Sequence, residues 1–368
     1  QARQWLMVDC GLTFADPRRT PGVDLVLPDI AFIEEEKQDL LGIVLTHAHE
    51  DHYGAVLDLW PRLEAPVYAT RFTAGLLRAK ATENGREPYP EVRIVEQGAR
   101  IDLDPFSVEL IRVSHSIPEP NALASTTPVG TILHSGDFKI DPRPGVGDPI
   151  DIARFKSLGD EGVIAMMSDS TNATRPGHSP SEHDVAQSLT EIVKATPHRV
   201  AITAFSSNVA RIRAIFEAAV ASDRHVVVMG RAMRRVISVA AECGFMDGLP
   251  SPLAEDDFAH LPRDKVLVLL TGSQGEDRAA LARIANGDHP RVAFSPGDRV
   301  IFSSRTIPGN EKAVNGVVNG LTLQGVEVIT DHEALVPTAG HPRSDELREM
   351  YRLVRPRVVV PVGGERMP

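Results

Sequence analysis

The stretch Thr-His-Ala-His-Glu-Asp-His at residues 46–52 directly follows an apolar run, and this placement constrains the fold more than any other feature. Side chains alternate along an extended chain, so His47 and His49 point to the same side. Once the chain turns, Asp51 and His52 can reach a second ion beside the first. Imidazoles and carboxylates are ligands of zinc and similar divalent ions, and their order here makes a polar loop with scattered histidines a poor alternative. The motif therefore predicts a metal site at the carboxyl end of a buried strand.

The chain has 368 residues, of which 42% are hydrophobic and 24% charged, and this fits two domains of a globular protein. It contains no apolar stretch of about 18 residues, so no membrane span is expected. The two cysteines, Cys10 and Cys243, form no CxxC pair, and we interpret them as core residues of a cytoplasmic protein without disulfides. The chain starts Gln-Ala-Arg-Gln, without a Met or a signal peptide, which we interpret as the interior of a longer protein or a trimmed chain.

The net charge of −11 argues at first against a nucleic-acid partner, because phosphates attract cations. Bound metal would neutralise several acidic groups, however, and arginines cluster locally, at positions 211 and 213 and again at 231, 234 and 235. An arginine cluster of this kind is also found on solvated helix faces. The net charge therefore weakens a nucleic-acid interpretation without deciding it.

Strand-like runs alternate with helical patterns, which predicts an α/β protein with layered sheets. The predicted strands are 5–9, 43–46, 67–69, 108–113, 130–134, 163–167, 200–204, 225–229, 266–270, 300–302, 326–330 and 358–362. The predicted helices are 71–82, 182–195, 209–221, 232–243, 278–286, 311–324 and 345–353. Ser181 with Asp184 is typical of a capping box, and Asn208 is a good N-cap.

The segment 179–325 has its own strand–helix alternation and few histidines, while ligand-type residues lie before and after it. This pattern predicts a domain inserted into another: a first part at 1–178, the insert at 179–325 and a return segment at 326–368.

Three further residues repeat the pattern of a strand that ends in a ligand: Asp9, His115 and Asp137. A single His or Asp after a strand is more often a cap or turn residue, but together with the 46–52 motif they predict a centre for two metals. Asp137 could bridge the two ions, and Asp9 could hold the other nitrogen of a histidine ligand. His134 competes with His115 but precedes the turn at Gly136, and we expect it to point elsewhere.

Further along the chain, four phrases accompany these residues: Ser-Asp-Ser-Thr-Asn at 168–172, Phe-Ser-Ser-Asn at 205–208, Gly-Ser-Gln-Gly-Glu at 272–276 and Gly-His-Pro at 340–342. The ordered set resembles the metallo-β-lactamase fold, and more narrowly its β-CASP branch and the ribonuclease J family. The resemblance covers nearly the whole chain. It implies an αββα sandwich of two mixed sheets, interrupted by an α/β β-CASP domain. It also implies cleavage of RNA, both endonucleolytically and 5′→3′ from a 5′-monophosphate end, in RNA processing and decay.

Residue by residue, the resemblance implies three ligands for one ion, two for the other and one bridging carboxylate: His47, His49 and His115; Asp51 and His52; and Asp137. The ions would be zinc, with manganese as the alternative. Asp169 would be an acidic residue near the active site, and His341 would contact the scissile phosphate and assist proton transfer. The segments implied to bind the RNA backbone are Ser206, Ser207, Asn208, Pro337, Thr338, Ala339, Gly340 and His341. Hydroxyls, amides and backbone N–H groups at a helix start suit phosphate oxygens, although the residues before Asn208 could also be only a helix cap.

The chain departs from the family at its third β-CASP motif. The family phrase Pro-Val-His-Gly-Glu corresponds to Pro-Val-Gly-Gly-Glu at 361–365, and Gly363 has no side chain to complete the second metal site. The resemblance therefore implies a second site that is only partly occupied. From the resemblance we also expect that the chain begins after the first strands of the family fold and ends before the C-terminal region, which assists dimerisation in family members.

We predict a metal-dependent ribonuclease that acts on RNA and does not associate with membranes. One alternative is a weakened RNA-binding or scaffolding protein, which Gly363 favours. Another is a small-molecule hydrolase, for which the inserted domain would have no purpose. DNA cleavage is a third, because DNA-directed β-CASP enzymes lack a histidine at the third motif.

Overall fold

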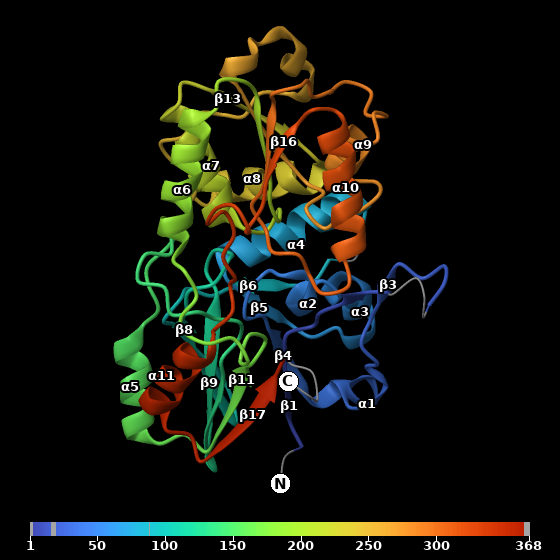
Figure 1. Ribbon diagram of the computed structural model, residues 1–368. Helices are drawn as coiled ribbons and strands as arrows, with labels where there is room; N and C mark the ends of the chain where they lie inside the picture. Colours follow the sequence, from blue (N-terminus) through green and yellow to red (C-terminus); the bar gives the residue numbers. More distant parts are fainter. Residues whose placement is uncertain (1–2, 16–19, 88, 364–368) are drawn as a thin grey trace. The chain divides into compact units, whose positions relative to one another are not determined.

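The computed structural model of the protein describes residues 3–15, 20–87 and 89–363 (Figure 1). They divide into two compact units. Unit 1 comprises the described residues of 1–140, 149–179 and 340–368, and unit 2 comprises 141–148 and 180–339. Within the described residues, no helix combines the length and the apolar character needed to span a bilayer.

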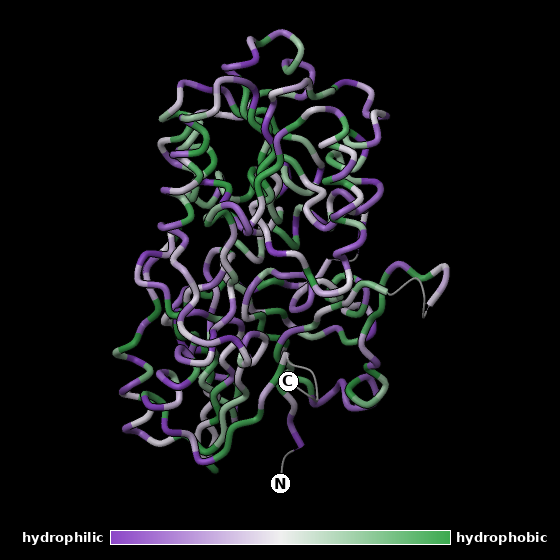
Figure 2. The backbone as a smooth tube through the Cα atoms, in the orientation of Figure 1, coloured by the Kyte–Doolittle hydropathy of each residue, from purple (hydrophilic) through white to green (hydrophobic). Residues whose placement is uncertain are grey.

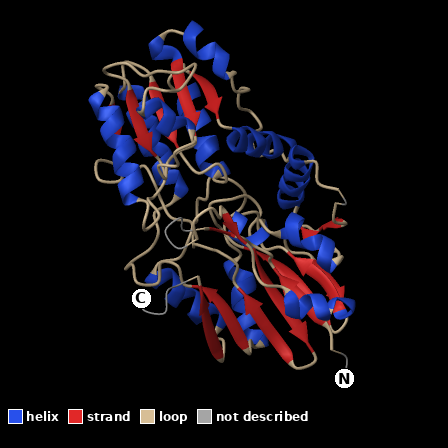
Figure 3. Ribbon diagram, turned by 90° about the vertical axis from the view of Figure 1, so that its right-hand side faces the viewer, coloured by secondary structure: helices blue, strands red, loops and turns tan. Residues whose placement is uncertain are grey.

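Unit 1 contains two larger sheets and a small hairpin (Figure 3). The four-stranded sheet is parallel, in the order β1 (Trp5–Val8), β4 (Leu40–Val44), β5 (Val67–Ala69) and β6 (Val92–Ile94). The six-stranded sheet is mixed, in the order β17 (Val358–Val362), β11 (Ala165–Asp169), β10 (Gly130–His134), β9 (Asn121–Thr127), β8 (Phe106–Arg112) and β7 (Arg100–Leu103). Strands β2 (Thr13–Phe14) and β3 (Leu25–Val26) form the hairpin.

The helical elements of unit 1 are α1 (Ala31–Glu35), the 3₁₀ turn η1 (Lys37–Asp39), α2 (Glu50–Tyr53), α3 (Val56–Leu63), α4 (Arg71–Asn84), α5 (Ile152–Glu161) and α11 (Ser344–Val354).

Alternation along the strands of unit 1 builds a layered core. On β8, Val108 and Leu110 face Val44 and Tyr68 of the other sheet, so one face of each sheet is buried between them. Ile111, next along β8, packs on the opposite side with residues of α5 and α11. Because successive side chains on a strand point to opposite faces, one strand contributes to both layers. The predicted αββα sandwich is confirmed.

Unit 2 is built on one parallel sheet in the order β13 (His225–Met229), β14 (Val266–Leu270), β12 (Val200–Thr203), β15 (Arg299–Phe302) and β16 (Glu327–Ile329). All five residues of β14 are buried, as expected for a central parallel strand covered on both faces, and the strands appear green in Figure 2. The helical elements are α6 (Glu182–Ala195), α7 (Val209–Val220), α8 (Arg231–Glu242), η2 (Glu255–His260), η3 (Arg263–Lys265), α9 (Ala280–Ala285) and α10 (Glu311–Leu323).

Most predicted elements occur within a few residues of their expected bounds, but some elements gave no sequence signal. Strand β9 has the sequence Asn-Ala-Leu-Ala-Ser-Thr-Thr, whose small residues lack the apolar run of a typical strand. Helix α5 buries only Phe155 and Leu158, too little for a clear helical pattern. The cap of α6 also differs from the expected box: Ser181 accepts from the backbone N–H of His183, whereas Asp184 accepts from Arg143.

The chain returns to unit 1 at residue 340, later than the expected domain limit at residue 326. The expected return at residue 326 lies inside unit 2, because β16 pairs with β15 and Val326 packs into the core of that sheet. The predicted core position of Cys10 is confirmed, since it is buried, whereas Cys243 is partly exposed.

Arg211 on α7 joins distant segments of unit 2, although only 1% of its side chain is exposed. Its Nη2 lies 2.9 Å from Oε2 of Glu182, itself 2% exposed, and its Nη1 donates to the carbonyl oxygens of Ser303 and Val336. The helix pair α6–α7 is thereby tied to the ends of β15 and of the segment before residue 337. A buried charge is tolerated here because it is paired and hydrogen-bonded.

We predict that Arg211→Met lowers the free energy of unfolding by about 3–5 kcal/mol, because the Glu182 carboxylate is left buried without its partner. The matched control is Arg291→Met, which removes an exposed pair with Asp256 and should change the same quantity by less than about 1 kcal/mol. Chemical denaturation followed by circular dichroism measures both values. Equal effects of the two substitutions would refute the structural role of Arg211.

Candidate metal centre

Most candidate site residues of unit 1 lie at the end of a strand or shortly after it. After β4 the chain stays extended through His49, and helix α2 then begins, which carries Asp51 and His52 on its first turn. His115 follows β8, and Asp137 follows β10. Asp169 is the last residue of β11. Each of these side chains is therefore placed by the end of a strand whose body is held in a sheet.

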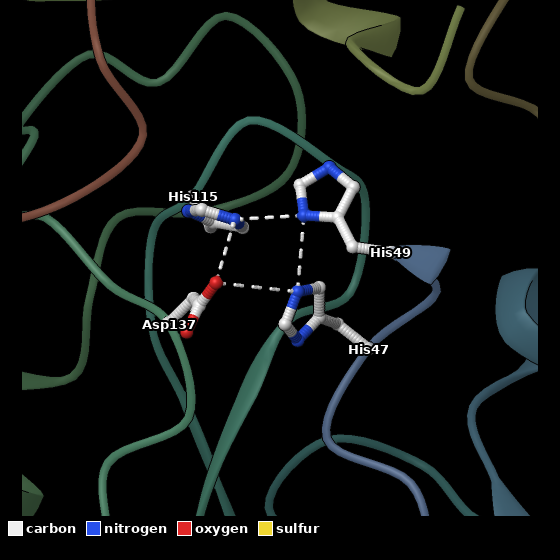
Figure 4. Close-up of side chains that lie close together, drawn as sticks. All are labelled: His47, His49, His115 and Asp137. Carbon is white, nitrogen blue, oxygen red and sulfur yellow. Dashed lines mark hydrogen bonds and ion pairs between the residues drawn. The ribbon is translucent and has the colours of Figure 1, made fainter. Parts of the chain in front are cut away.

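The first cluster consists of His47, His49, His115 and Asp137, whose ligand atoms all lie within 4.8 Å of one another (Figure 4). The Nε2 atoms of His47 and His115 lie 3.1 and 3.0 Å from Nδ1 of His49. Both Nε2 atoms lie 3.8 and 3.7 Å, respectively, from Oδ2 of Asp137. Four ligands held tetrahedrally by zinc at about 2.0–2.1 Å stand roughly 3.3 Å apart. The donor set and its spacing therefore fit a divalent ion.

The second cluster consists of Asp51, His52 and Asp137, so Asp137 is common to both. Nε2 of His52 lies 3.3 Å from Oδ2 of Asp137 and 3.8 Å from Oδ2 of Asp51. This group offers three protein ligands, and the Asp51 side chain is 69% exposed. The second cluster is thus smaller and more open than the first.

In His47, His52 and His115, the ring nitrogen that does not face the cluster has a hydrogen-bond partner, which fixes the direction of the ligand nitrogen. Asp9 Oδ2 lies 2.7 Å from Nδ1 of His52 and also accepts from the hydroxyl of Thr46. That hydroxyl lies 2.9 Å from Nδ1 of His47. The Thr46 hydroxyl donates its hydrogen to Asp9, so towards His47 its oxygen can only accept a hydrogen bond. Nδ1 of His47 therefore carries the proton, and Nε2 has a free lone pair for an ion. Residues that orient ligands in this way support metal affinity.

Asp9 reaches this position from a left-handed backbone conformation, with φ of 59°. The next residues, Cys10 to Leu12, run against the backbone of the 46–52 loop, and the amide of Cys10 donates to the carbonyl of His52. A Cβ at Gly11 would lie 1.7 Å from the carbonyl oxygen of Asp51, so only glycine permits this approach.

Burial determines the protonation of the first cluster. Burial, together with the charges of neighbouring histidines, holds the pKa of His47 and of His115 well below the usual value. Burial also lowers the pKa of His49 to about 4. These imidazoles are neutral at pH 7, so no proton competes with an ion for the ligand nitrogens.

The pKa values of His52 and Asp137 are set by neighbouring charges more than by burial. For His52, burial opposes the charged form, but Asp9 and Asp137 outweigh it and raise the pKa well above the usual value. For Asp137, burial opposes ionisation, but His52, His47 and His341 outweigh it and lower the pKa well below the usual value. The negative charge of Asp137 is therefore fixed at the centre of both clusters.

His341 and Gly340 join the centre from a distant part of the chain. The carbonyl of Gly340 accepts from Nδ1 of His115 at 2.6 Å, and a Cβ at Gly340 would meet the His115 ring at the same distance. His341 Nδ1 lies 2.8 Å from Oδ2 of Asp169, which is 1% exposed, and 3.7 Å from Oδ2 of Asp137. Burial opposes protonation of His341, but the bond to Asp169 and the charges of Asp169, Asp137 and Asp51 raise its pKa to about 9.

Gly363, at the end of β17, lies near Asp169. A Cβ added there would be 2.9 Å from Oγ1 of Thr171 and 3.8 Å from Oδ1 of Asp169, and the backbone has φ of +75°. The last two residues of the third β-CASP motif, 364 and 365, lie outside the described residues. His134, the alternative to His115, instead accepts from the amide of Gly136 at 3.1 Å and is absent from both clusters of described residues.

The structure places the other predicted site residues in unit 2. Ser206, Ser207 and Asn208 follow β12, and residues 337–339 close unit 2. Asn208 caps α7 by accepting from the amide of Arg211, and its Nδ2 donates to Glu182. The supporting roles of Thr46 and of the Gly340 carbonyl were missed, because a hydroxyl or a carbonyl oxygen beside a motif carries no sequence signal of its own.

Comparison with known proteins agrees with this architecture. Residues 1–231 match the metallo-beta-lactamase superfamily, and residues 197–321 match the family described as ribonuclease J, beta-CASP domain. A crystal structure of a protein of unknown function from Enterococcus faecalis V583 aligns with a TM-score of 0.64, over 95% of this chain and 79% of that chain. The two share 16% sequence identity, so this likeness concerns the fold alone.

Three curated relatives extend the match to nearly the whole chain. Ribonuclease J of Sinorhizobium meliloti is 57% identical over 99% of this chain and 64% of the relative. Ribonuclease J of Corynebacterium glutamicum is 42% identical, over 98% of this chain and 50% of the relative. Ribonuclease J 1 of Streptococcus pyogenes is 38% identical, over 98% of this chain and 64% of the relative.

The chain thus spans between half and two-thirds of the length of these relatives. The fold, the two family matches and the identity to these relatives agree with the resemblance that the sequence motifs indicated. The chain belongs to the metallo-beta-lactamase superfamily, and its residues 197–321 match the beta-CASP domain of ribonuclease J.

Proposed function

We propose that this chain is a metal-dependent ribonuclease of the ribonuclease J type, which hydrolyses phosphodiester bonds of RNA. The observation that carries the proposal is the convergence of two ligand clusters on the shared carboxylate of Asp137. The family membership supports RNA as the substrate, because the curated relatives are named ribonuclease J.

The proposed cofactors are two divalent ions, zinc or alternatively manganese, held by the residues of the two clusters: His47, His49 and His115; Asp51 and His52; and Asp137. When bound, such ions supply a water of lowered pKa and positive charge for the phosphate oxygens. The neutral first cluster is ready to bind without releasing protons. Because the second cluster has three protein ligands and an exposed Asp51, we propose weaker and partial occupancy there.

His341 is the proposed proton donor. With a pKa of about 9 it is protonated near pH 7, and its Nδ1 faces Asp169, so Nε2 is the nitrogen that can face a phosphate. In hydrolysis, a new bond forms between the water oxygen and phosphorus, and the bond from phosphorus to the 3′ oxygen breaks. Nε2 of His341 would give its proton to that leaving oxygen, and the other product carries a 5′-phosphate. Asp169 would hold the ring in place.

We further propose that Ser206, Ser207, Asn208 and residues 337–340 bind the RNA backbone, with preference for a 5′-monophosphate. Hydroxyls and backbone N–H groups suit phosphate oxygens. Asn208 Oδ1 is occupied as the cap of α7, which leaves Ser206 and Ser207 as the better candidates of that loop. For the longer protein we propose a cytoplasmic homodimer that combines 5′→3′ exonuclease and endonuclease activity.

The alternative functions are less well supported. The family comparisons do not favour a weakened RNA-binding or scaffolding protein, and the first cluster is complete despite Gly363. A small-molecule hydrolase would not need the inserted domain that matches the ribonuclease J β-CASP family.

We predict that the metal-loaded protein shortens a 5′-monophosphorylated RNA and leaves a matched DNA and a chromogenic lactam intact. Gel analysis of the three substrates, with metal content measured in parallel, tests this prediction. RNA binding without cleavage would favour the scaffolding alternative, and DNA cleavage or lactam hydrolysis would contradict the proposal directly.

We predict that His49→Ala abolishes RNA cleavage, with a loss of about 100-fold or more, and removes one ion per chain, because the first cluster loses a ligand. The fold should persist, since His49 lies after a strand end and not within a core. Metal analysis and circular dichroism measure both effects. The matched control is His178→Ala, whose side chain is 55% exposed and lies 3.6 Å from the carboxylate of Glu349. A fully active His49→Ala variant would exclude the first cluster as the site.

We predict that Gly363→His raises the occupancy of the second ion and the turnover number, if a missing ligand limits this site. The substitution places a side chain beside Asp169, at the cost of a left-handed backbone that disfavours histidine. The metal content per chain at limiting metal is the measurement. An unchanged metal content in a folded variant would show that position 363 does not limit the second site.

A further inference from the structure

Glu346 on α11 is a fully buried carboxylate, with 0% of the residue exposed, that takes no part in either ligand cluster. Its two oxygens accept three backbone N–H groups. Oε1 accepts from Ile140, and Oε2 accepts from Ser179 and Arg343, each at 2.8 Å. Two of these donors are 206 and 167 residues away in sequence. All four residues belong to unit 1.

Helix capping accounts for only one of these three bonds. Glu346 is at the third position of α11, and its bond to the amide of Arg343 is the reciprocal half of a capping box. In a capping box, the glutamate side chain accepts a hydrogen bond from one backbone N–H group, that of the N-cap residue. The bonds to Ile140 and Ser179 add nothing to the helix itself, so they require another explanation.

The three donors belong to segments that form the metal centre. Ile140 lies three residues after Asp137 in the same loop, in which the amide of Phe138 donates to Asp169 at 3.4 Å. Arg343 follows His341 by two residues. The hydroxyl of Ser179 donates to the carbonyl of His341 at 2.9 Å, so the second distant bond of Glu346 also acts on the His341 loop.

We propose that Glu346 is a positioning residue for the proposed reaction: its carboxylate joins the Asp137 loop to the His341 loop and so sets the place of His341 beside the shared ligand. Oδ2 of Asp137 and Nδ1 of His341 stand 3.7 Å apart, and their loops are joined through Glu346 behind the centre. Two oxygens that serve three donors need a full carboxylate, because an amide presents only one acceptor. The kinetic part of this proposal rests on the proposed ribonuclease function.

Glu346→Gln is the informative substitution. If the glutamine oxygen replaces Oε2, its NH₂ group faces the amide of Ile140, and the reverse orientation leaves both Ser179 and Arg343 without an acceptor. Glu346→Asp keeps the charge but shortens the reach, and serves as the second variant if the glutamine variant is too unstable. The matched control is Glu349→Gln on the same helix, whose side chain is 43% exposed.

The first measurement is amide hydrogen exchange of the metal-free protein, which does not depend on activity. In Glu346→Gln we expect exchange to accelerate by about tenfold or more in the peptides that contain Ile140, Ser179 and residues 341–343, because unprotected amides open locally. Glu349→Gln should leave these peptides unchanged. Unaltered exchange in Glu346→Gln would overturn the proposal.

The second measurement is a double-mutant cycle on RNA cleavage. Glu346→Gln should lower kcat by about 10–100-fold, as for other residues that support a metal centre, while KM changes less than about threefold and the metal content is retained. In a His341→Ala background the same substitution should lower kcat by less than about threefold, because the two effects are coupled. An equal loss of kcat in both backgrounds would overturn the positioning role. Failure of the parent protein to cleave RNA would refute the proposed function alone, and the exchange measurement would still test Glu346.

Discussion

The metal centre of unit 1 depends on the Asp137 carboxylate, which is shared by the two ligand clusters and by a third group with Asp169 and His341. Neutral, buried imidazoles would gain nothing from facing one another without an ion or a negative charge among them. Asp137 supplies that charge, and its pKa is held well below the usual value by the histidines around it. His52, His47 and His115 in turn are each oriented by a hydrogen-bond partner: Asp9, Thr46 and the Gly340 carbonyl, respectively. The ligands are therefore oriented by residues that hydrogen-bond to them and are not ligands themselves.

Strand ends are suited to this task because the sheet fixes where each loop begins. The strands of unit 1 bury their side chains in two separate layers, so their ends are held without any help from the ligands. Glycine permits two close approaches at the site, at Gly11 against the Asp51 carbonyl and at Gly340 against the His115 ring. The loops can then be polar and partly buried without loss of order.

Both units use one buried charged side chain to join segments that are far apart in sequence. In unit 2 Arg211 ties α6 and α7 to the ends of two later segments, and in unit 1 Glu346 ties α11 to the Asp137 loop and to Ser179. Burial of a charge is costly, and it is offset here by several directed hydrogen bonds. Such bonds are geometrically specific, whereas apolar packing tolerates small shifts. We regard this specificity as the reason that an arginine and a glutamate occur at these core positions.

Most of the longer strands and helices and the family resemblance could be predicted from the sequence, because apolar periodicity and the ordered motif are local signals. His47, His49, Asp51 and His52 are adjacent in the chain, so their grouping needed only the geometry of an extended segment followed by a turn. The atoms that support these ligands could be identified only from contacts between distant segments. Thr46, Gly340 and Glu346 act through a hydroxyl, a carbonyl oxygen and a buried carboxylate that meet partners from distant segments, and no local pattern marks such partners. The place of β16 in unit 2 was likewise decided by strand pairing, which links residues that no short window contains.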